Sequence, residues 1–169
     1  MTPEVLLRAA EPFDLDFLYT LENENVSTDG ALTAPPSRRM LHDYLTAYSA
    51  DIFADKQLRL VIADAATGDA VGAVDIYDFA PRDRRGYVGI AVLERFRGRG
   101  YGKAALDALC TFASGSLGMH QLAAMVAADN DAARSLFASC GFKGCGRLRS
   151  WLRRGTRYAD AIIFQRLFC

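Results

Sequence analysis

Three glycines alternate with basic and aromatic side chains in one short segment, which is the part of the sequence best suited to bind a ligand. It reads Arg97-Gly98-Arg99-Gly100-Tyr101-Gly102-Lys103 and lies between an apolar run and an amphipathic stretch. Glycine lets the backbone approach a ligand closely and adopt positive φ. The first turn of a following helix offers unpaired N–H groups and the positive end of its dipole. Together these features predict a site for an anion, above all phosphate.

The spacing of the glycines separates the known phosphate-binding patterns. A P-loop needs serine or threonine after its lysine, whereas Ala104 follows Lys103. A dinucleotide fingerprint GxGxxG lacks its third glycine, whether it is counted from the first or the second glycine of the segment. The pattern that fits is R/Q-x-x-G-x-G/A, with Arg97, Gly100 and Gly102 at its fixed positions.

The charged residues are distributed unevenly, although the net charge is zero. Residues 1–80 contain 14 acidic and 5 basic residues, whereas residues 81–169 contain 6 acidic and 15 basic ones. We therefore expect an anionic ligand on the second half and a cationic substrate on the first. The alternative is that the two halves neutralise each other across the folded surface.

Hydrophobic periodicity predicts the elements that must position these residues. Strands are expected at residues 5–8, 58–63, 71–77, 87–93, 122–126, 143–152 and 157–167, and helices after Pro12, after Ser37, after Gly102 and after a cap at Asp129, Asn130 or Asp131. Residues 23–36 are polar and predict a loop. The run from Val88 to Leu93 is apolar on both faces, which is typical of a central strand. The order predicts an α/β (α+β) fold with a mixed sheet, antiparallel first and with a parallel crossover later.

Length and composition favour one domain spanning residues 1–169. Hydrophobic residues make up 51% of the chain and charged residues 24%, which is typical of globular proteins. The sequence contains no run of about 20 apolar residues, which a membrane-spanning helix needs, and no recognisable secretory signal. We therefore expect a cytoplasmic protein. The four cysteines form no CxxC pair and only two histidines are present, which favours reduced thiols and no metal site.

In these motifs and their order, the chain resembles the GCN5-related N-acetyltransferase (GNAT) superfamily. The resemblance rests on Arg97-x-x-Gly100-x-Gly102 after a buried strand, with Phe137-x-x-x-Gly141-Phe142 closing a later helix. It extends from residue 5 to residue 168 and is most specific over residues 86–142. Two further segments make it most similar to the spermidine and ribosomal-protein alanine acetyltransferase branch, namely Leu21-Glu22-Asn23 and Gly155-x-x-Tyr158-x-Asp160.

The resemblance implies a fold and a co-substrate. The fold would be a mixed, mostly antiparallel sheet of about seven strands with flanking helices and a splayed central strand. The co-substrate would be acetyl-CoA, with its pyrophosphate on the backbone N–H groups of Arg97, Gly98, Arg99, Gly100, Tyr101, Gly102 and Lys103. Its pantetheine would pair with Ile90, Ala91 and Val92. Asn130 and the face from Ala133 to Phe137 would line the same cleft, unless Asn130 is only a helix cap and Phe137 only a core residue.

The resemblance also implies catalytic positions. The backbone N–H of Val92 would polarise the thioester carbonyl in the manner of an oxyanion hole. Many relatives carry at position 137 a tyrosine that protonates the leaving thiolate, and Phe137 cannot do this. Tyr87, Tyr101 or Tyr158 could replace it. Tyr87 also stands where some relatives place a glutamate base on the central strand. Asp75 matches an acidic position of the spermidine acetyltransferases and is the candidate base.

The substrate would be a primary amine, and the acetyl group would be transferred to it directly within one cleft. Glu22, Asn23 and Glu24 lie in the loop that covers the acceptor site in relatives, and Asp75 and Tyr77 share one face of their strand. The acidic residues favour a small cationic amine such as a polyamine. Acetylation of a peptide N-terminus is the close alternative.

Two interpretations from other classes stay open. Phe137 and the strand without a glutamate are compatible with a weakly catalytic CoA-binding module. Arg147, Arg149, Arg153, Arg154 and Arg157 would suit nucleic acid, but few aromatic residues lie among them and the net charge is zero, so nucleic acid is the less favoured partner. No membrane partner is expected, and a homo-oligomer is compatible with the sequence.

Overall fold

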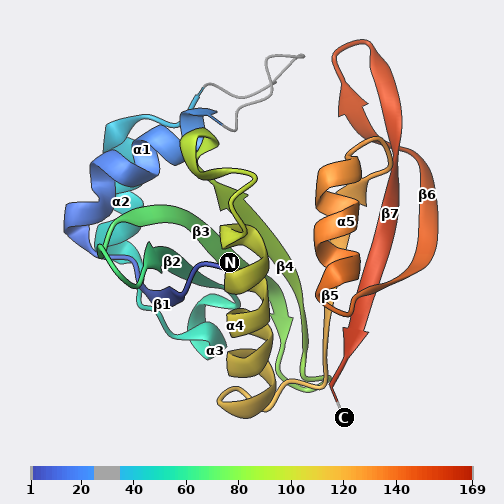
Figure 1. The fold of residues 1–169 in the computed structure, drawn as a ribbon, viewed down its shortest axis with the longest axis horizontal. Helices are drawn as coiled ribbons and strands as arrows, with labels where there is room; N and C mark the ends of the chain where they lie inside the picture. Colours follow the sequence, from blue (N-terminus) through green and yellow to red (C-terminus); the bar gives the residue numbers. More distant parts are fainter. Residues whose placement is uncertain (1, 25–34, 169) are drawn as a thin grey trace.

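The residues that the computed structural model describes, 2–24 and 35–168, form a seven-stranded sheet flanked by helices (Figure 1). Its strands are β1 Val5–Ala9, β2 Leu58–Asp64, β3 Ala70–Ala80, β4 Arg85–Val92, β5 Gln121–Ala127, β6 Lys143–Arg154 and β7 Arg157–Leu167. The helices are α1 Leu15–Glu24, α2 Arg38–Ala47, α3 Ile52–Asp55, α4 Tyr101–Gly115 and α5 Asp131–Ser139, with short 3₁₀ helices η1 Pro12–Asp14 and η2 Glu94–Phe96.

The sheet has the order β1-β2-β3-β4-β5-β7-β6, and its strand pairs are antiparallel except for the parallel pair of β4 with β5. That pair is short, because β4 contacts β5 only at Arg85, Gly86 and Tyr87. Beyond Tyr87 the two strands diverge (Figure 1). The mixed, mostly antiparallel sheet with a splayed central strand is therefore confirmed.

Helices cover both faces of the first half of the sheet, and the alternation of β3 shows which side chains meet which helix. Val74 and Ile76 pack in the core cluster that contains Leu106 and Leu109 of α4. Ala73, on the opposite face, packs with residues of α1 and α2. Because side chains alternate along a strand, Asp75 and Tyr77 lie on the α1/α2 face.

Local signals set several helix ends where the sequence predicts them. The Ser37 hydroxyl accepts the N–H of Met40 at 3.1 Å and caps α2. Asn130 is the N-cap residue of α5. Gly141 has φ +80° directly after α5, a conformation that glycine adopts at little cost.

The structure corrects two predicted boundaries and adds one helix that was not predicted. Helix α1 continues to Glu24, past the predicted start of the loop at Asn23. The side-chain amide of Asn23 donates to the Tyr19 carbonyl one turn earlier, at 2.7 Å. The rest of the predicted loop, except residues 35 and 36, lies outside the described residues. Strand β3 extends to Ala80, and helix α3 was not predicted because its single turn, capped by Asp51, is too short for a periodic pattern.

Candidate active site

A cleft of about 540 Å³ opens where β4 leaves β5, between α4 and α5. It brings together most of the residues predicted to bind a co-substrate. Its lining consists of Ile90, Ala91, Val92, Phe96, Arg97, Gly98, Gly100, Tyr101, Gly102, Lys103, Asn130, Ala132, Ala133 and Leu136. Of the predicted co-substrate residues, only Arg99 and Phe137 are missing from this lining.

The glycine segment forms the turn that leads into α4. Gly98 and Gly100 have φ +71° and +90°, the left-handed region that favours glycine, and Gly100 is the N-cap residue. Gly100 has no side chain to cap this helix, and the first N–H groups of α4 are therefore available to a ligand. A Cβ on Gly100 would lie 2.9 Å from Cδ of Pro3, and one on Gly102 would lie 3.4 Å from Cδ2 of Leu136. The segment is thus shaped for backbone contact with an anion.

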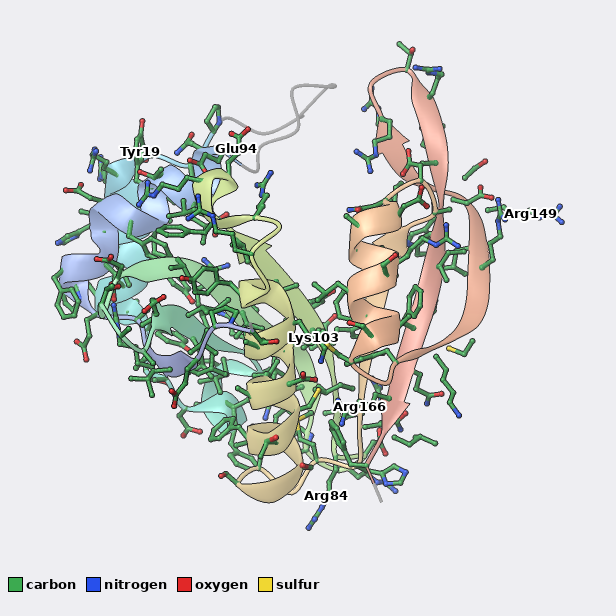
Figure 2. All side chains as sticks on the ribbon, in the orientation of Figure 1. Tyr19, Arg84, Glu94, Lys103, Arg149 and Arg166 are labelled. Atoms are coloured by element: carbon green, nitrogen blue, oxygen red, sulfur yellow. The ribbon has the colours of Figure 1, made fainter. Side chains whose placement is uncertain are left out.

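The basic side chains of the segment lie in different surroundings. Arg97 Nε donates to the Val92 carbonyl at 2.9 Å. Lys103 forms an ion pair with Asp107 one turn along α4, at 2.6 Å, and points from α4 toward α5 (Figure 2). The Arg99 guanidinium lies 5.8 Å from the centre of the Phe96 ring. Arg97 and Lys103 line the cleft itself, with the charge of Lys103 balanced in part by Asp107, whereas Arg99 stands beside the cleft.

A hydrogen bond of Tyr101 links the glycine segment to the turn after β2. The Tyr101 hydroxyl donates to the Asp64 carboxylate, which also accepts the N–H groups of Ala66 at 2.8 Å and Thr67 at 3.0 Å. These hydrogen bonds lower the pKa of Asp64, and the bond to Asp64 raises the pKa of Tyr101. The Tyr101 hydroxyl is therefore committed to positioning the loop.

The splay leaves one backbone edge of β4 open toward the cleft. The Leu93 N–H donates to the Val71 carbonyl at 2.9 Å, and the Ala91 carbonyl points toward Gly72, so residues 91 and 93 bond to β3. In an antiparallel ladder the residue between them points its N–H and C=O the other way. Val92 thus directs its N–H into the cleft, and its carbonyl accepts the bond from Arg97.

Helix α5 supplies the opposite wall of the cleft. The Asn130 side-chain oxygen accepts the N–H of Ala133 at 3.0 Å, so Asn130 both caps α5 and lines the cleft. Phe137 is only 4% exposed and packs in the core instead. Its ring stands edge-on to Phe142 at 5.2 Å and parallel to Phe164 at 6.3 Å.

On the other face of the sheet, Arg59 holds two of the predicted substrate-binding carboxylates. Its Nε and a terminal nitrogen donate to the two oxygens of Asp75 at 2.7 and 3.0 Å, and its other nitrogen donates to Glu22 at 2.8 Å. All three side chains are half-buried. Because one guanidinium faces two carboxylates, the cluster has a net charge of −1, and this pairing raises the pKa of Arg59 despite its burial.

Arg59 and Asp75 border a pocket of about 280 Å³, which is lined by Tyr44, Gln57, Leu58, Arg59, Asp75, Ile76 and Tyr77. Burial raises the pKa of Tyr44 to about 12, although nearby Arg59 lowers it, so this hydroxyl stays neutral. Tyr77 stacks on Tyr87 with ring centres 5.6 Å apart. Tyr87 faces Ala123 in the last β4–β5 pair, at the base of the splay.

The remaining predicted substrate residues anchor the end of α1. Glu24 accepts the N–H of Glu94, at the start of η2, at 3.0 Å. Asn23 also donates to the Pro36 carbonyl at 3.2 Å. Both side chains therefore link α1 to neighbouring segments, and Glu24 links it to the chain that leads into the glycine segment.

Sequence reasoning missed Arg59, which lies at the centre of the charged cluster. The signal was in the hairpin register, since Arg59 of β2 pairs directly with Asp75 of β3. Aligning the two predicted strands across the turn at residues 67–69 would instead place Arg59 opposite Tyr77, and the register shift between Ile62 and Ala63 brings the opposite charges side by side.

A family model described as an acetyltransferase (GNAT) domain matches residues 4–143 of this sequence. The chain belongs to the GNAT acetyltransferase family. It is 24% identical over 160 residues to spermidine N(1)-acetyltransferase of Vibrio cholerae, with 95% of this chain and 91% of that protein covered. It is 21% identical over 159 residues to the uncharacterised N-acetyltransferase YoaA of Bacillus subtilis, with coverages of 93% and 90%.

Solved structures share the GNAT fold along almost the whole chain. A chimera of the spermidine N-acetyltransferase SpeG from Vibrio cholerae and hSSAT superposes with a TM-score of 0.85, at 23% identity, covering 97% of this chain and 95% of that one. The dodecameric structure of the Vibrio cholerae enzyme gives a TM-score of 0.81 at 24% identity, with coverages of 97% and 94%.

The GNAT family uses acetyl-CoA as its co-substrate, and the residues present fit its chemistry. A pyrophosphate needs backbone donors and positive charge, which the uncapped start of α4, Arg97 and Lys103 offer. Within residues 2–24 and 35–168, no group of three or more His, Cys, Asp or Glu side chains could hold a metal ion. No helix in that part of the chain is long and apolar enough to cross a membrane.

Proposed function

We propose that this GNAT acetyltransferase transfers the acetyl group of acetyl-CoA to a small cationic primary amine, such as a polyamine. The observation that carries the proposal is the juxtaposition of two sites across β4. One face holds a cleft with the glycine segment and the open edge of the strand, and the other holds a carboxylate cluster with net negative charge. An anionic co-substrate and a cationic acceptor are the pair that such a charge distribution favours.

In this proposal each residue has a distinct task. Acetyl-CoA, when bound, supplies the thioester that the amine attacks. The N–H groups of residues 97–103 hold the pyrophosphate, and the N–H of Val92 polarises the carbonyl. Asp75 orients the amine and accepts its proton, because a carboxylate bonded twice to Arg59 keeps further lone pairs free. Tyr87 is the candidate donor of a proton to the thiolate.

The surroundings of the other candidate residues support the choice of Tyr87 as proton donor. Tyr101 is bonded to Asp64, and Tyr158 lies exposed on the β6–β7 hairpin. Phe137 lies in the core and carries no proton. Tyr87 lies at the base of the splay and stacks on Tyr77 of the Asp75 pocket, so it is the tyrosine of this set that the proposal retains.

A peptide N-terminus is the second candidate acceptor, and a specific observation favours keeping it. Arg59 already neutralises one of the two carboxylates, so the cluster matches a single ammonium group. An α-amino group carries one charge, whereas a polyamine carries several. The curated relative named as a spermidine acetyltransferase supports the polyamine.

CoA release from acetyl-CoA, followed by chromatography, tests the proposal. The acceptors are polyamines, monoamines, amino acids, aminoglycosides and short peptides. Release stimulated by one class identifies the acceptor. If acetyl-CoA raises the melting temperature but no amine stimulates release, the result favours the weakly catalytic module or an acceptor outside this panel. If there is neither release nor a thermal shift, the interpretation of the glycine segment is refuted.

The proposal also covers the oligomeric state, nucleic-acid binding and the cellular location. We propose a homo-oligomer, supported by the dodecamer of the Vibrio cholerae relative. Nucleic acid is not included, because Arg147 is paired with Asp160 at 2.6 Å and Arg154 with Asp129 at 3.7 Å, although Arg149 points away from the molecule (Figure 2). Location in the cytoplasm stays a prediction of the sequence.

A further inference from the structure

The two proposed sites lie on opposite faces of the sheet, so an acceptor must pass β4 to reach a thioester. Asp75 and Tyr77 border the pocket on the α1/α2 face. Ile90 and Val92 border the cleft and pack with the core on the α4 face. The passage has to lie where β5 no longer pairs with β4, which is beyond Tyr87.

Gly89 occupies this place. It follows the last β4–β5 pair by two residues, it faces Asp75 across the β3–β4 ladder, and it directly precedes Ile90 of the cleft. A Cβ built on Gly89 would lie 3.7 Å from Cε1 of Tyr77 and 3.9 Å from Oδ2 of Asp75. The space beside Gly89 is thus bordered by the residues proposed to hold the amine.

Neither the backbone nor the packing requires glycine at position 89. Its φ is outside the left-handed region, and the two contacts of an added Cβ are ordinary van der Waals distances. The other glycines of β3 and β4 differ. A Cβ on Gly72 would lie 2.4 Å from the Ala91 carbonyl oxygen, and one on Gly86 would lie 2.9 Å from Cγ2 of Ile76. Those two glycines are explained by close packing, whereas position 89 has room for a Cβ.

We propose that Gly89 forms the opening through which the acceptor amine reaches the thioester, and that its missing side chain sets the size of the acceptor that is admitted. The inference rests on the proposed function. A side chain at position 89 would fill the space between the Asp75 carboxylate and the Tyr77 ring without touching the glycine segment. It would exclude first those amines that are branched at the carbon next to nitrogen.

A graded series at this position tests the inference. Gly89→Ala, Gly89→Val and Gly89→Leu are compared with the wild type using a straight-chain amine and an amine branched next to nitrogen. We expect kcat/KM for the straight-chain amine to fall about threefold with alanine and at least tenfold with valine. The loss for the branched amine should be several times larger at each step. The dissociation constant of acetyl-CoA should stay within twofold of the wild type.

The matched control is Gly144→Val on β6, where a Cβ would also meet only an ordinary contact, Cγ2 of Ile162 at 3.8 Å. It should leave both amines within twofold of the wild type. If wild type and Gly89→Val have equal kcat/KM with both amines, this inference is overturned while the proposed function stands. A loss of acetyl-CoA binding in Gly89→Ala overturns it too, because the position would then serve the cleft. A wild type that no amine stimulates overturns the proposed function and this inference together.

Discussion

Replacing Gly100 by alanine tests the glycine segment most directly. The residue has φ +90° at the N-cap of α4, and its added Cβ would lie 2.9 Å from Cδ of Pro3. A left-handed conformation costs a non-glycine residue about 1–2 kcal/mol. If the free loop relaxes out of that conformation, acetyl-CoA must restore it, and 1.4 kcal/mol corresponds to tenfold in affinity. Gly100→Ala should therefore weaken acetyl-CoA binding about 5- to 30-fold.

The assay is calorimetric titration with acetyl-CoA, with the melting temperature measured in parallel. Gly98→Ala is the matched control, because Gly98 has φ +71° but an added Cβ meets nothing within 4 Å. It isolates the cost of the backbone conformation from that of the contact with Pro3, so its effect should be the smaller one. Adding Pro3→Gly to Gly100→Ala should restore part of the affinity. Wild-type affinity in Gly100→Ala, or a larger loss in Gly98→Ala, would refute the reasoning.

Three further substitutions probe other parts of the structure. Arg8→Met removes the two hydrogen bonds that Arg8 donates to Asp14, a carboxylate that is only 3% exposed. It should lower the free energy of unfolding, measured in urea, by about 1–3 kcal/mol, and an unchanged unfolding midpoint contradicts this. Tyr101→Phe should lower the melting temperature at neutral pH. Because the pKa of Asp64 is held below its ordinary value of 3.8, the difference from wild type should begin to shrink below that pH and disappear only once Asp64 is protonated in the folded protein; a pH-independent difference argues against the bond. Phe137→Tyr places a hydroxyl among core rings and should cost about 1–3 kcal/mol of stability without raising CoA release, whereas a large gain in turnover would mean that the new hydroxyl reaches the thioester.

The cleft around the glycine segment was predictable because its determinants are contiguous in the sequence. Residues 97–103 contain the glycines, and the apolar run before them and the helical pattern after them are both visible without structure. The same holds for the caps at Ser37 and Asn130, where one side chain decides the helix start. In such places the local signal agrees with the fold.

The acceptor side could be predicted only in part, because its properties depend on residues that are distant in sequence. Asp75 was identified as a carboxylate on a strand face, but its partner Arg59 lies 16 residues earlier and meets it through strand register. Glu22 joins from α1, 37 residues before Arg59. The burial of Phe137 likewise depends on Phe142 and Phe164, which come from outside its helix. Tertiary contacts of this kind leave no local pattern.

The divergence of β4 from β5 turns β4 into an edge strand enclosed within the molecule. An open edge on the outside would invite pairing with a strand of another chain. Here α4 and α5 flank the gap, so only a narrow, extended molecule with amide groups can satisfy Ile90 and Val92. Pantetheine has that shape and two amides. Acetyl-CoA would thus act as a transient extra strand that joins two otherwise weakly connected half-sheets, and amide hydrogen exchange across β4, β5 and β7 should slow cooperatively when it binds.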